Sequence, residues 1–158
     1  MASIATALQD GGAIFGILSF SWLAVRIGRR MSFALVFTMA LAMTIMVFGF
    51  MRVESQIYWM TPLLGFANLA IFGGYTIYFP ELYPTRLRST GTGFCYNIAR
   101  YVVAFGIFGL GGLNLLYAGM GFGADSFRWA AMTMAMMYLV GIFALPFAPE
   151  TKGKPLPE

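Results

Sequence analysis

The chain has 158 residues, of which 59% are hydrophobic and only 10% are charged, and its net charge is +4. A soluble domain carries about 25% charged residues, and one of this size could not enclose so much apolar surface in a single core. The composition therefore excludes a conventional water-soluble enzyme or nucleic-acid-binding protein. The single cysteine, Cys95, excludes an internal disulfide. Histidine is absent from the sequence, which removes His-based catalytic triads and most zinc sites, so we expect no cofactor.

Five apolar runs, each long enough to cross a lipid bilayer, follow one another along the chain. They cover residues 4–25, 31–51, 57–79, 91–116 and 129–147, and a polar tail follows at 148–158. These runs lack the ten-residue alternation of polar and apolar residues that is typical of a transmembrane barrel. The sequence therefore predicts an all-α, polytopic transmembrane helix bundle that contacts the lipid bilayer.

Basic residues are distributed unequally between the two ends of these spans. One side has seven, namely Arg26, Arg29, Arg30, Arg86, Arg88, Lys152 and Lys154, and the other side has Arg52 and Arg128. Cytoplasmic loops carry the excess of Lys and Arg in membrane proteins. We therefore expect an integral protein of the plasma or inner membrane with its C-terminus in the cytoplasm.

The loop between the third and fourth spans contains the most distinctive string, PELYPTRLRSTGTG at 80–93. Pro80 and Pro84 are expected to stop the preceding helix and to hold an extended turn. Gly91 and Gly93 allow the next helix to approach a neighbour closely. Taken alone, these features describe a well-formed loop.

Three segments resemble motifs of the major facilitator superfamily of transporters. VRIGRR at 25–30 resembles the D-R-x-G-R-R loop that follows the second helix of each half. ELYP at 81–84, with Arg88 and Gly91 after it, resembles the loop after the tenth helix, and PETKG at 149–153 resembles the string after the twelfth helix of sugar-porter-like members. Their order and spacing are similar to helices eight to twelve, the C-terminal part of a twelve-helix carrier.

This resemblance implies the function. Such a carrier moves a small organic solute (an organic acid, an organic ion or a sugar) by alternating access between two halves. The N-terminal half of the carrier and helix seven have no counterpart in the sequence, so the alternative is a truncated or non-transporting membrane module that needs a partner chain. We do not expect the chain to be an enzyme, because its sequence contains no plausible nucleophile–base pair, metal cluster or lipid-phosphate motif.

Charged residues on the predicted cytoplasmic face resemble the ion-pair network that holds such carriers outward-open. The predicted gate residues are Arg26, Arg29, Arg30, Glu81, Arg86, Arg88 and Glu150. The alternative is a set of solvated loops that simply follow the distribution of positive charge. The first motif also departs from the family, because Val25 stands where the family has an acidic residue, and the contact of that carboxylate with a neighbouring helix is absent.

Arg100 lies about ten residues into the fourth span, near mid-bilayer, where a charged side chain costs about 2.5 kcal/mol or more. Helical spacing places Asn97 and Arg100 on a stripe of small and polar residues, opposite a stripe of bulky ones. Such a cation is expected to bind a substrate carboxylate or to pair with an acid on another helix, or else to serve as a structural cation that reaches the interface. Organic-ion carriers of the superfamily have a similar arginine on this helix, which favours an anionic solute.

Other polar residues also lie within the predicted spans. Gln9 and Asp10 interrupt the first span, and Asp10 is the only acidic residue within any predicted span. Asp10 is expected to carry a proton for symport, to contact a cation or to pair with Arg100. If the span begins after it, Asp10 is instead an interfacial residue. Asn68, at the centre of the third span, is either a substrate contact or an interhelical contact. Tyr75 lies beside two glycines. The predicted solute-binding residues are therefore Gln9, Asp10, Asn68, Tyr75, Asn97 and Arg100.

Overall fold

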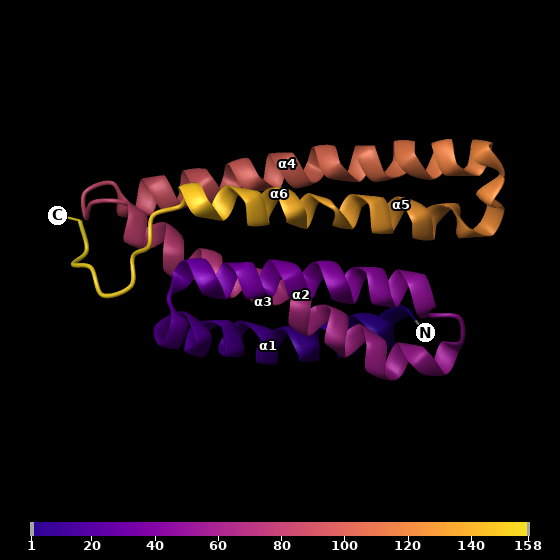
Figure 1. Cartoon of the computed structure of the whole chain (residues 1–158), viewed down its shortest axis with the longest axis horizontal. Helices are drawn as coiled ribbons and strands as arrows, with labels where there is room; N and C mark the ends of the chain where they lie inside the picture. The colour runs from indigo at the N-terminus through magenta and orange to yellow at the C-terminus, as the bar shows by residue number, and fades with distance from the viewer. Residues whose placement is uncertain (1, 158) are drawn as a thin grey trace.

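The computed structural model describes residues 2–157, which form helices, turns and a tail with no strand among them (Figure 1). Four long helices come first: α1 (Ala2–Ile27), α2 (Arg29–Phe50), α3 (Ile57–Leu82) and α4 (Arg88–Tyr117). Two shorter helices follow, α5 (Ser126–Ala135) and α6 (Met137–Ala144), and the connecting turns are η1 (Glu54–Gln56), η2 (Ala118–Phe122), η3 (Gly123–Asp125) and η4 (Leu145–Phe147). The predicted all-α transmembrane helix bundle is confirmed.

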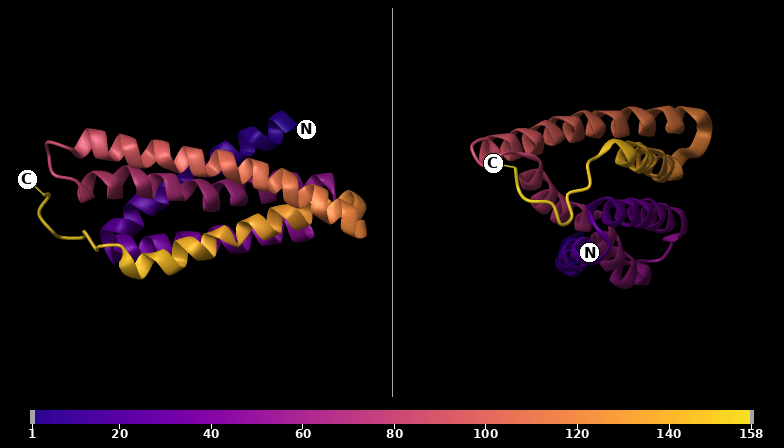
Figure 2. Two further views of the ribbon diagram at one scale, coloured as in Figure 1. Left: turned by 90° about the horizontal axis from the view of Figure 1, so that it is seen from above. Right: turned by 60° about the vertical axis from the view of Figure 1, so that its left-hand side comes forward.

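Four helical segments of residues 2–157 are long and apolar enough to cross a membrane: Ser3–Ile27, Arg29–Phe50, Glu54–Leu82 and Arg88–Phe147. The last of these covers 60 residues and reverses direction at η2 and η3. Gly121 and Gly123 have φ angles of 92° and 49° there, and glycine adopts this left-handed backbone most easily. Helix α4 therefore lies side by side with α5, as a hairpin, whereas α6 runs on along α2 (Figures 1 and 2).

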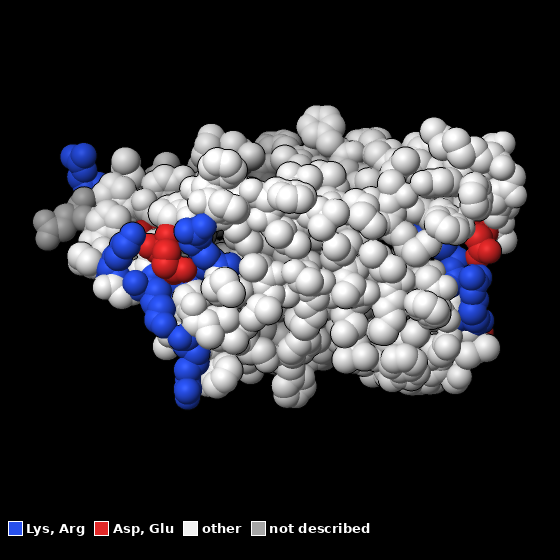
Figure 3. Space-filling view, viewed as in Figure 1, with Lys and Arg blue, Asp and Glu red and all other residues white. Residues whose placement is uncertain are grey.

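Both ends of the bundle collect chain connections. The α1–α2 turn, the α3–α4 loop and the C-terminal tail lie together at one end, which we call the basic end, whereas η1, η2 and η3 lie at the opposite end (Figures 1 and 2). The seven basic residues that the sequence places on one side of the spans all belong to segments of the basic end. Figure 3 shows Lys and Arg side chains gathered around acidic ones at this end, a smaller group of charged side chains at the opposite end, and uncharged surface between the two.

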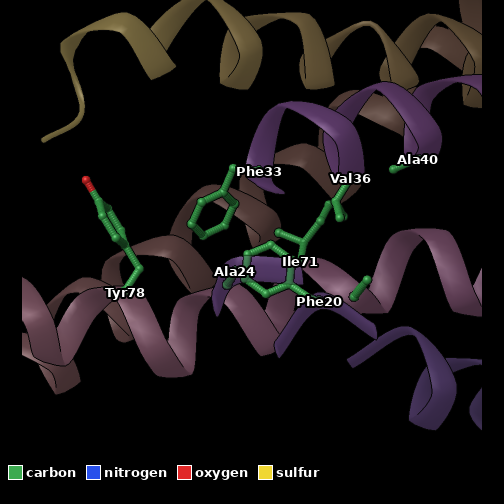
Figure 4. Close-up of a cluster of buried hydrophobic side chains, with 8 residues drawn as sticks. Phe20, Ala24, Phe33, Val36, Ala40, Ile71 and Tyr78 are labelled. Atoms are coloured by element: carbon green, nitrogen blue, oxygen red, sulfur yellow. The ribbon is translucent and has the colours of Figure 1, made fainter. Parts of the chain in front are cut away.

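The hydrophobic core lies between α1, α2 and α3. Its buried residues are Phe20, Ala24, Phe33, Val36, Ala40, Ala70, Ile71 and Tyr78 (Figure 4). The ring of Phe33 occupies the centre, with its centroid 5.0 Å from that of Phe20 and 5.6 Å from that of Tyr78. Helix α4 contributes no buried residue, so the hairpin packs on this core from outside.

Small residues bring α1 and α3 into backbone contact. A Cβ atom at Gly16 would overlap the carbonyl of Phe66, and a Cβ atom at Gly65 would overlap the carbonyl of Gln9. Helix pairs in membranes gain their stability from such close packing, because lipid tails are as apolar as the side chains. The α1–α3 crossing therefore fixes the framework on which the candidate sites are built.

Helix α3 passes Pro80 and ends at Leu82, three residues beyond the predicted span. Proline keeps a helical φ angle and removes only the hydrogen bond to the carbonyl of Thr76, in the last turn of the helix. The helix ends where Tyr83 becomes extended, with φ −111° and ψ 143°. This is the conformation that a following proline, here Pro84, favours.

Candidate functional site

The carboxylate of Glu150, in the tail, closes the N-terminus of α2. It accepts hydrogen bonds from the backbone N–H groups of Arg29 (2.9 Å) and Arg30 (3.1 Å). The N–H groups of Thr151 and Lys152 also donate to it, at 3.1 and 3.0 Å. Burial opposes ionisation, but these four donors outweigh it and hold the pKa of Glu150 below its ordinary value. A carboxylate here also satisfies free N–H groups and complements the helix dipole.

Gly28 makes room for this carboxylate. Its φ angle is 94°, and a Cβ atom on it would lie only 2.9 Å from Oε2 of Glu150. Its carbonyl accepts a hydrogen bond of 2.7 Å from the hydroxyl of Ser32. The glycine of the first motif is thus needed both for the backbone turn and for the approach of the tail.

Arg29 and Glu81 form a two-point ion pair beside Glu150. Nη2 of Arg29 lies 2.6 Å from Oε1 of Glu81, and Nε donates to Oε2 at 3.0 Å. The two side chains are only 15% and 16% exposed. Nη1 of Arg29 also donates to the carbonyl of Ala24, and the hydroxyl of Thr151 donates to Glu81. These contacts, which we call the charged cluster (Arg29, Glu81, Glu150 and Thr151), join α1, α2, α3 and the tail.

The charged cluster brings together three of the seven predicted gate residues. Arg30 joins it only through its backbone, because its guanidinium donates to the carbonyl of Pro146 at 3.2 Å. Arg88 lies nearby but donates to the carbonyl of Pro80 at 3.1 Å rather than to a carboxylate. Thr151 was not among the predicted residues, although it lies within the PETKG string, because a hydroxyl gives no charge signal.

Two predicted gate residues point away from the cluster. The guanidinium of Arg26 lies over the ring of Trp22, with its Cζ atom 5.0 Å from the ring centroid. Arg86 is exposed in the α3–α4 loop, and within residues 2–157 neither arginine forms an ion pair with a carboxylate. The gate function of all seven residues stays a prediction.

A groove of about 450 Å³ opens between α3 and α4. Its polar lining consists of Asn68 and Tyr75 from α3, Tyr96 and Arg100 from α4, and Tyr138 from α6. We call it the arginine groove. Three of the six predicted solute-binding residues lie together in this groove: Asn68 and Tyr75 on α3 and Arg100 on α4.

The guanidinium of Arg100 is exposed at the edge of the arginine groove. Its Cζ atom lies 4.8 Å from the ring centroid of Tyr96, one helical turn earlier, in a cation–π contact. None of the carboxylates in the described part of the chain forms an ion pair with it. The charge of Arg100 is therefore available to an anionic group that enters the groove.

Aromatic rings form the apolar wall of the arginine groove. Phe72 meets Tyr75 edge-on, with ring centroids 6.0 Å apart. Tyr75 in turn stacks on Phe79, which lies outside the groove lining, with centroids 5.0 Å apart and planes at 4°. A second depression of about 710 Å³ shares Tyr75 and Tyr96 and extends to Arg88. Tyr75 and Tyr96 thus separate the arginine groove from a depression that lies toward the basic end.

The two predicted asparagines have different surroundings. Asn68 lines the arginine groove, and its Oδ1 accepts a hydrogen bond of 3.4 Å from the hydroxyl of Thr44 on α2. Asn97 is exposed, and its amide donates to the carbonyl of Gly93 at 2.8 Å in its own helix. It does not line the arginine groove.

Gln9 and Asp10 lie on α1, outside the arginine groove. The backbone of Gln9 packs against Gly65 at the α1–α3 crossing. Asp10 is exposed, and no ion pair joins it to Arg100 in the described part of the molecule. Roles of these two residues in solute binding or proton transfer stay predictions.

A second polar cluster at the opposite end was not predicted. Asp125 pairs with Arg52 at 3.1 Å and with Arg128 at 3.6 Å. Arg128 also donates to the carbonyls of Phe48 and Gly49, at 2.7 and 3.2 Å. A cation is favoured at such a helix C-terminus. The cluster ties the C-terminal end of α2 to the turn of the hairpin, and the side-chain pattern alone could not reveal the two backbone partners of Arg128.

The chain is similar to transport proteins along nearly its whole length, although no family model matches it. It is 34% identical over 152 residues to a protein of Haemophilus influenzae named for metabolite transport, covering 96% of this chain and 35% of the relative. A protein of Cupriavidus pinatubonensis named as a 4-methylmuconolactone transporter is 27% identical (90% and 32%). Niacin transporter NiaP of Acinetobacter baylyi is 29% identical (89% and 30%). The chain thus spans about a third of the length of these relatives.

Proposed function

Since this chain is a relative of major facilitator superfamily transporters, we propose that it forms part of the C-terminal half of a carrier that moves a small organic solute across a membrane. The three relatives above are all named for transport and not for an enzymatic activity. Four helical segments of the described chain have the length and apolarity of membrane spans. Both observations support an integral membrane protein.

The arginine groove is the observation that carries this proposal. It places a cation without a carboxylate partner in the described chain, three tyrosines and an asparagine around one concave surface between α3, α4 and α6. A guanidinium binds a carboxylate through two parallel hydrogen bonds, and the rings of Phe72 and Tyr75 suit the apolar part of a solute. The groove therefore favours a small organic anion, with Arg100 as its charge contact.

In an alternating-access mechanism, the charged cluster would hold the helices of this half together. In carriers of this type the solute binds between two halves that rock against each other. Arg29, Glu81 and Glu150 hold α1, α2, α3 and the tail together as one body during that motion. Arg86 and Arg88, whose guanidinium groups meet no carboxylate in the described chain, remain available to an opposing half. Such contacts bias states that differ by only a few kcal/mol.

A second candidate is a non-transporting membrane module that needs a partner chain. The coverage of about a third of each relative favours it. It predicts that the chain alone gives no saturable flux in proteoliposomes, and that flux appears only when the complementary part of a carrier is supplied. Saturable flux by the chain alone would contradict this candidate.

The arginine groove is tested in a chimera. The chain replaces its matched 144-residue segment in the Acinetobacter niacin transporter, and uptake of labelled niacin is measured. Arg100→Ala should reduce uptake at least about tenfold, because it removes a charge-assisted hydrogen bond to the solute, which is worth about 1.5–3 kcal/mol. Arg100→Lys, which keeps the charge but not the two-point geometry, should retain a part of it. Equal uptake by Arg100→Ala and the unsubstituted chimera, at equal membrane abundance, would refute this role of Arg100.

A further inference from the structure

One face of α1 changes from apolar to cationic at intervals of one helical turn. Ile14, Leu18 and Trp22 are 61%, 62% and 60% exposed, and Arg26 follows four residues after Trp22. Side chains four residues apart lie above one another on a helix. From the bilayer core to the headgroups, a membrane favours first aliphatic side chains, then tryptophan and then cations. The residues along this face of α1 follow the same order. Arg26 and Trp22 therefore lie where this face meets the lipid headgroups.

A second cation joins this pair. The Nζ atom of Lys152 donates to the carbonyl of Arg26 at 2.7 Å, and the Cζ atom of Arg26 lies 5.0 Å from the ring centroid of Trp22. The ammonium is held there by the free carbonyl at the C-terminus of α1, which carries partial negative charge. Two positive charges thus meet at the last turn of α1, the guanidinium over the exposed ring of Trp22 and the ammonium at the carbonyl of Arg26.

The acidic residues at the basic end do not neutralise these two cations. Glu81 is bound by Arg29 and Thr151, and Glu150 accepts four backbone N–H groups. Among residues 2–157, no carboxylate lies within ion-pair distance of Arg26 or Lys152. The counter-ion of this pair must therefore come from outside the described chain.

An apolar groove begins at the same tryptophan. It has a volume of about 650 Å³ and is lined by residues that include Leu18, Trp22 and Leu23 of α1 and Leu35 and Met39 of α2. Trp22 thus contributes one surface to this groove and another to Arg26. A narrow apolar groove with a cationic rim matches a molecule that has a hydrocarbon chain and an anionic head.

We propose that Arg26, Lys152 and Trp22 bind the headgroup of one anionic phospholipid, with an acyl chain of that lipid in the groove between α1 and α2. The phosphate accepts hydrogen bonds from the guanidinium and the ammonium, both of which pair well with phosphate oxygens. Basic pockets between helices at a membrane surface recognise anionic headgroups in this way. The site is separate from the arginine groove and requires only that the chain lies in a bilayer.

The fluorescence of Trp22 reports on the site directly. The full chain carrying Trp59→Phe and Trp129→Phe, which leaves Trp22 as its single tryptophan, is reconstituted in phosphatidylcholine vesicles. Brominated phosphatidylglycerol or brominated phosphatidylcholine then competes for the surface of the protein and quenches Trp22. We expect a relative association constant of at least about fivefold in favour of the anionic lipid. Arg26→Gln with Lys152→Gln should lower this ratio to about one.

Matched variants separate the site from general attraction to negative charge. Lys154→Gln removes an equal charge from the same exposed tail, two residues from Lys152, and should leave the preference intact. Arg26→Lys should also keep it, which shows that the double variant does not act through misfolding. A preference that survives in the double variant, or that Lys154→Gln removes equally, would overturn the proposal. Displacement of the lipid by inorganic phosphate would instead identify a site for the free anion, and would also overturn it.

Discussion

Helices α1–α3 and the hairpin α4–α6 are packed in different ways. The first three helices supply the whole of the main buried cluster and cross each other at backbone distance, through Gly16 and Gly65. In contrast, α4 has no buried residue, and no atom of the described chain lies within 4 Å of a Cβ atom built at Gly111 or Gly112. Helices α1–α3 are thus closely packed against one another, whereas much of the surface of the hairpin is exposed.

The hairpin holds its own two arms by a few polar contacts. The hydroxyl of Ser126 donates to Asn114 at 2.7 Å, and the hydroxyls of Tyr117 and Thr133 share a hydrogen bond of 2.8 Å. The arginine groove lies on the boundary between this hairpin and the packed helices. One wall, α3, belongs to the closely packed helices, whereas the other wall, α4, has no buried residue. The groove is therefore bounded by one closely packed helix and one largely exposed helix.

The largest expected effect on the free energy of unfolding comes from the same substitution at two glycines with different surroundings. Gly65→Leu places a side chain against the carbonyl of Gln9 and should separate α1 from α3, at a cost of about 3 kcal/mol or more. Gly112→Leu meets open space on the hairpin and should change the free energy of unfolding by no more than about 1 kcal/mol. Unfolding in mixed micelles, followed by circular dichroism, measures both. Equal destabilisation by the two variants would break the comparison.

The next effect comes from a pair of phenylalanines. Phe20 is 1% exposed within the α1–α3 core, and Phe108 is 79% exposed on α4. Phe20→Ala removes packing contacts and leaves a cavity, which should cost about 3 kcal/mol. Phe108→Ala should cost less than about 0.5 kcal/mol, because its ring meets few atoms of the described chain. The same unfolding assay compares them, and a large loss for Phe108→Ala in the isolated chain would show that α4 is packed more firmly than its exposure indicates.

The hydropathy pattern predicted the fold class, and the motifs indicated the resemblance to transporters. Both predictions depend only on the order of residues along the chain. The helix bundle and the relationship to transporters are confirmed. The motifs also supplied Arg29, Glu81 and Glu150, which meet in space because three connections of the chain converge at the basic end. Thr151 and the carbonyl of Ala24 could not be predicted, since neither gives a charge signal.

Positions around a helix were harder to predict than depth along it. Asn97 and Arg100 are three residues apart and share a predicted stripe, yet only Arg100 lines the arginine groove. The amide of Asn97 instead bonds to Gly93 in its own turn. Asn68 and Tyr75 reach the groove because α3 presents them to α4, and that orientation depends on helix packing that one sequence does not encode locally.

The smallest expected effect concerns the tail, which links the hairpin back to the α1–α3 helices. Glu150 follows α6 and caps α2, and Glu150→Gln should cost about 1 kcal/mol at neutral pH, because it removes a charged cap from a helix N-terminus. Glu54→Gln, an exposed acid at the opposite end, is the matched control and should change stability little.

The pH dependence of unfolding tests the same contact independently. Because the folded protein holds the pKa of Glu150 below the ordinary 4.5, the carboxylate contributes its stability above that value and loses it as the pH falls through the folded pKa. The difference between the wild-type chain and Glu150→Gln should therefore be constant from neutral pH to about pH 5 and should shrink below it. A difference that grows on acidification would mean that the neutral acid is the stronger cap. In that case the tail would be held at α2 by the hydrogen bonds of a neutral acid rather than by its charge.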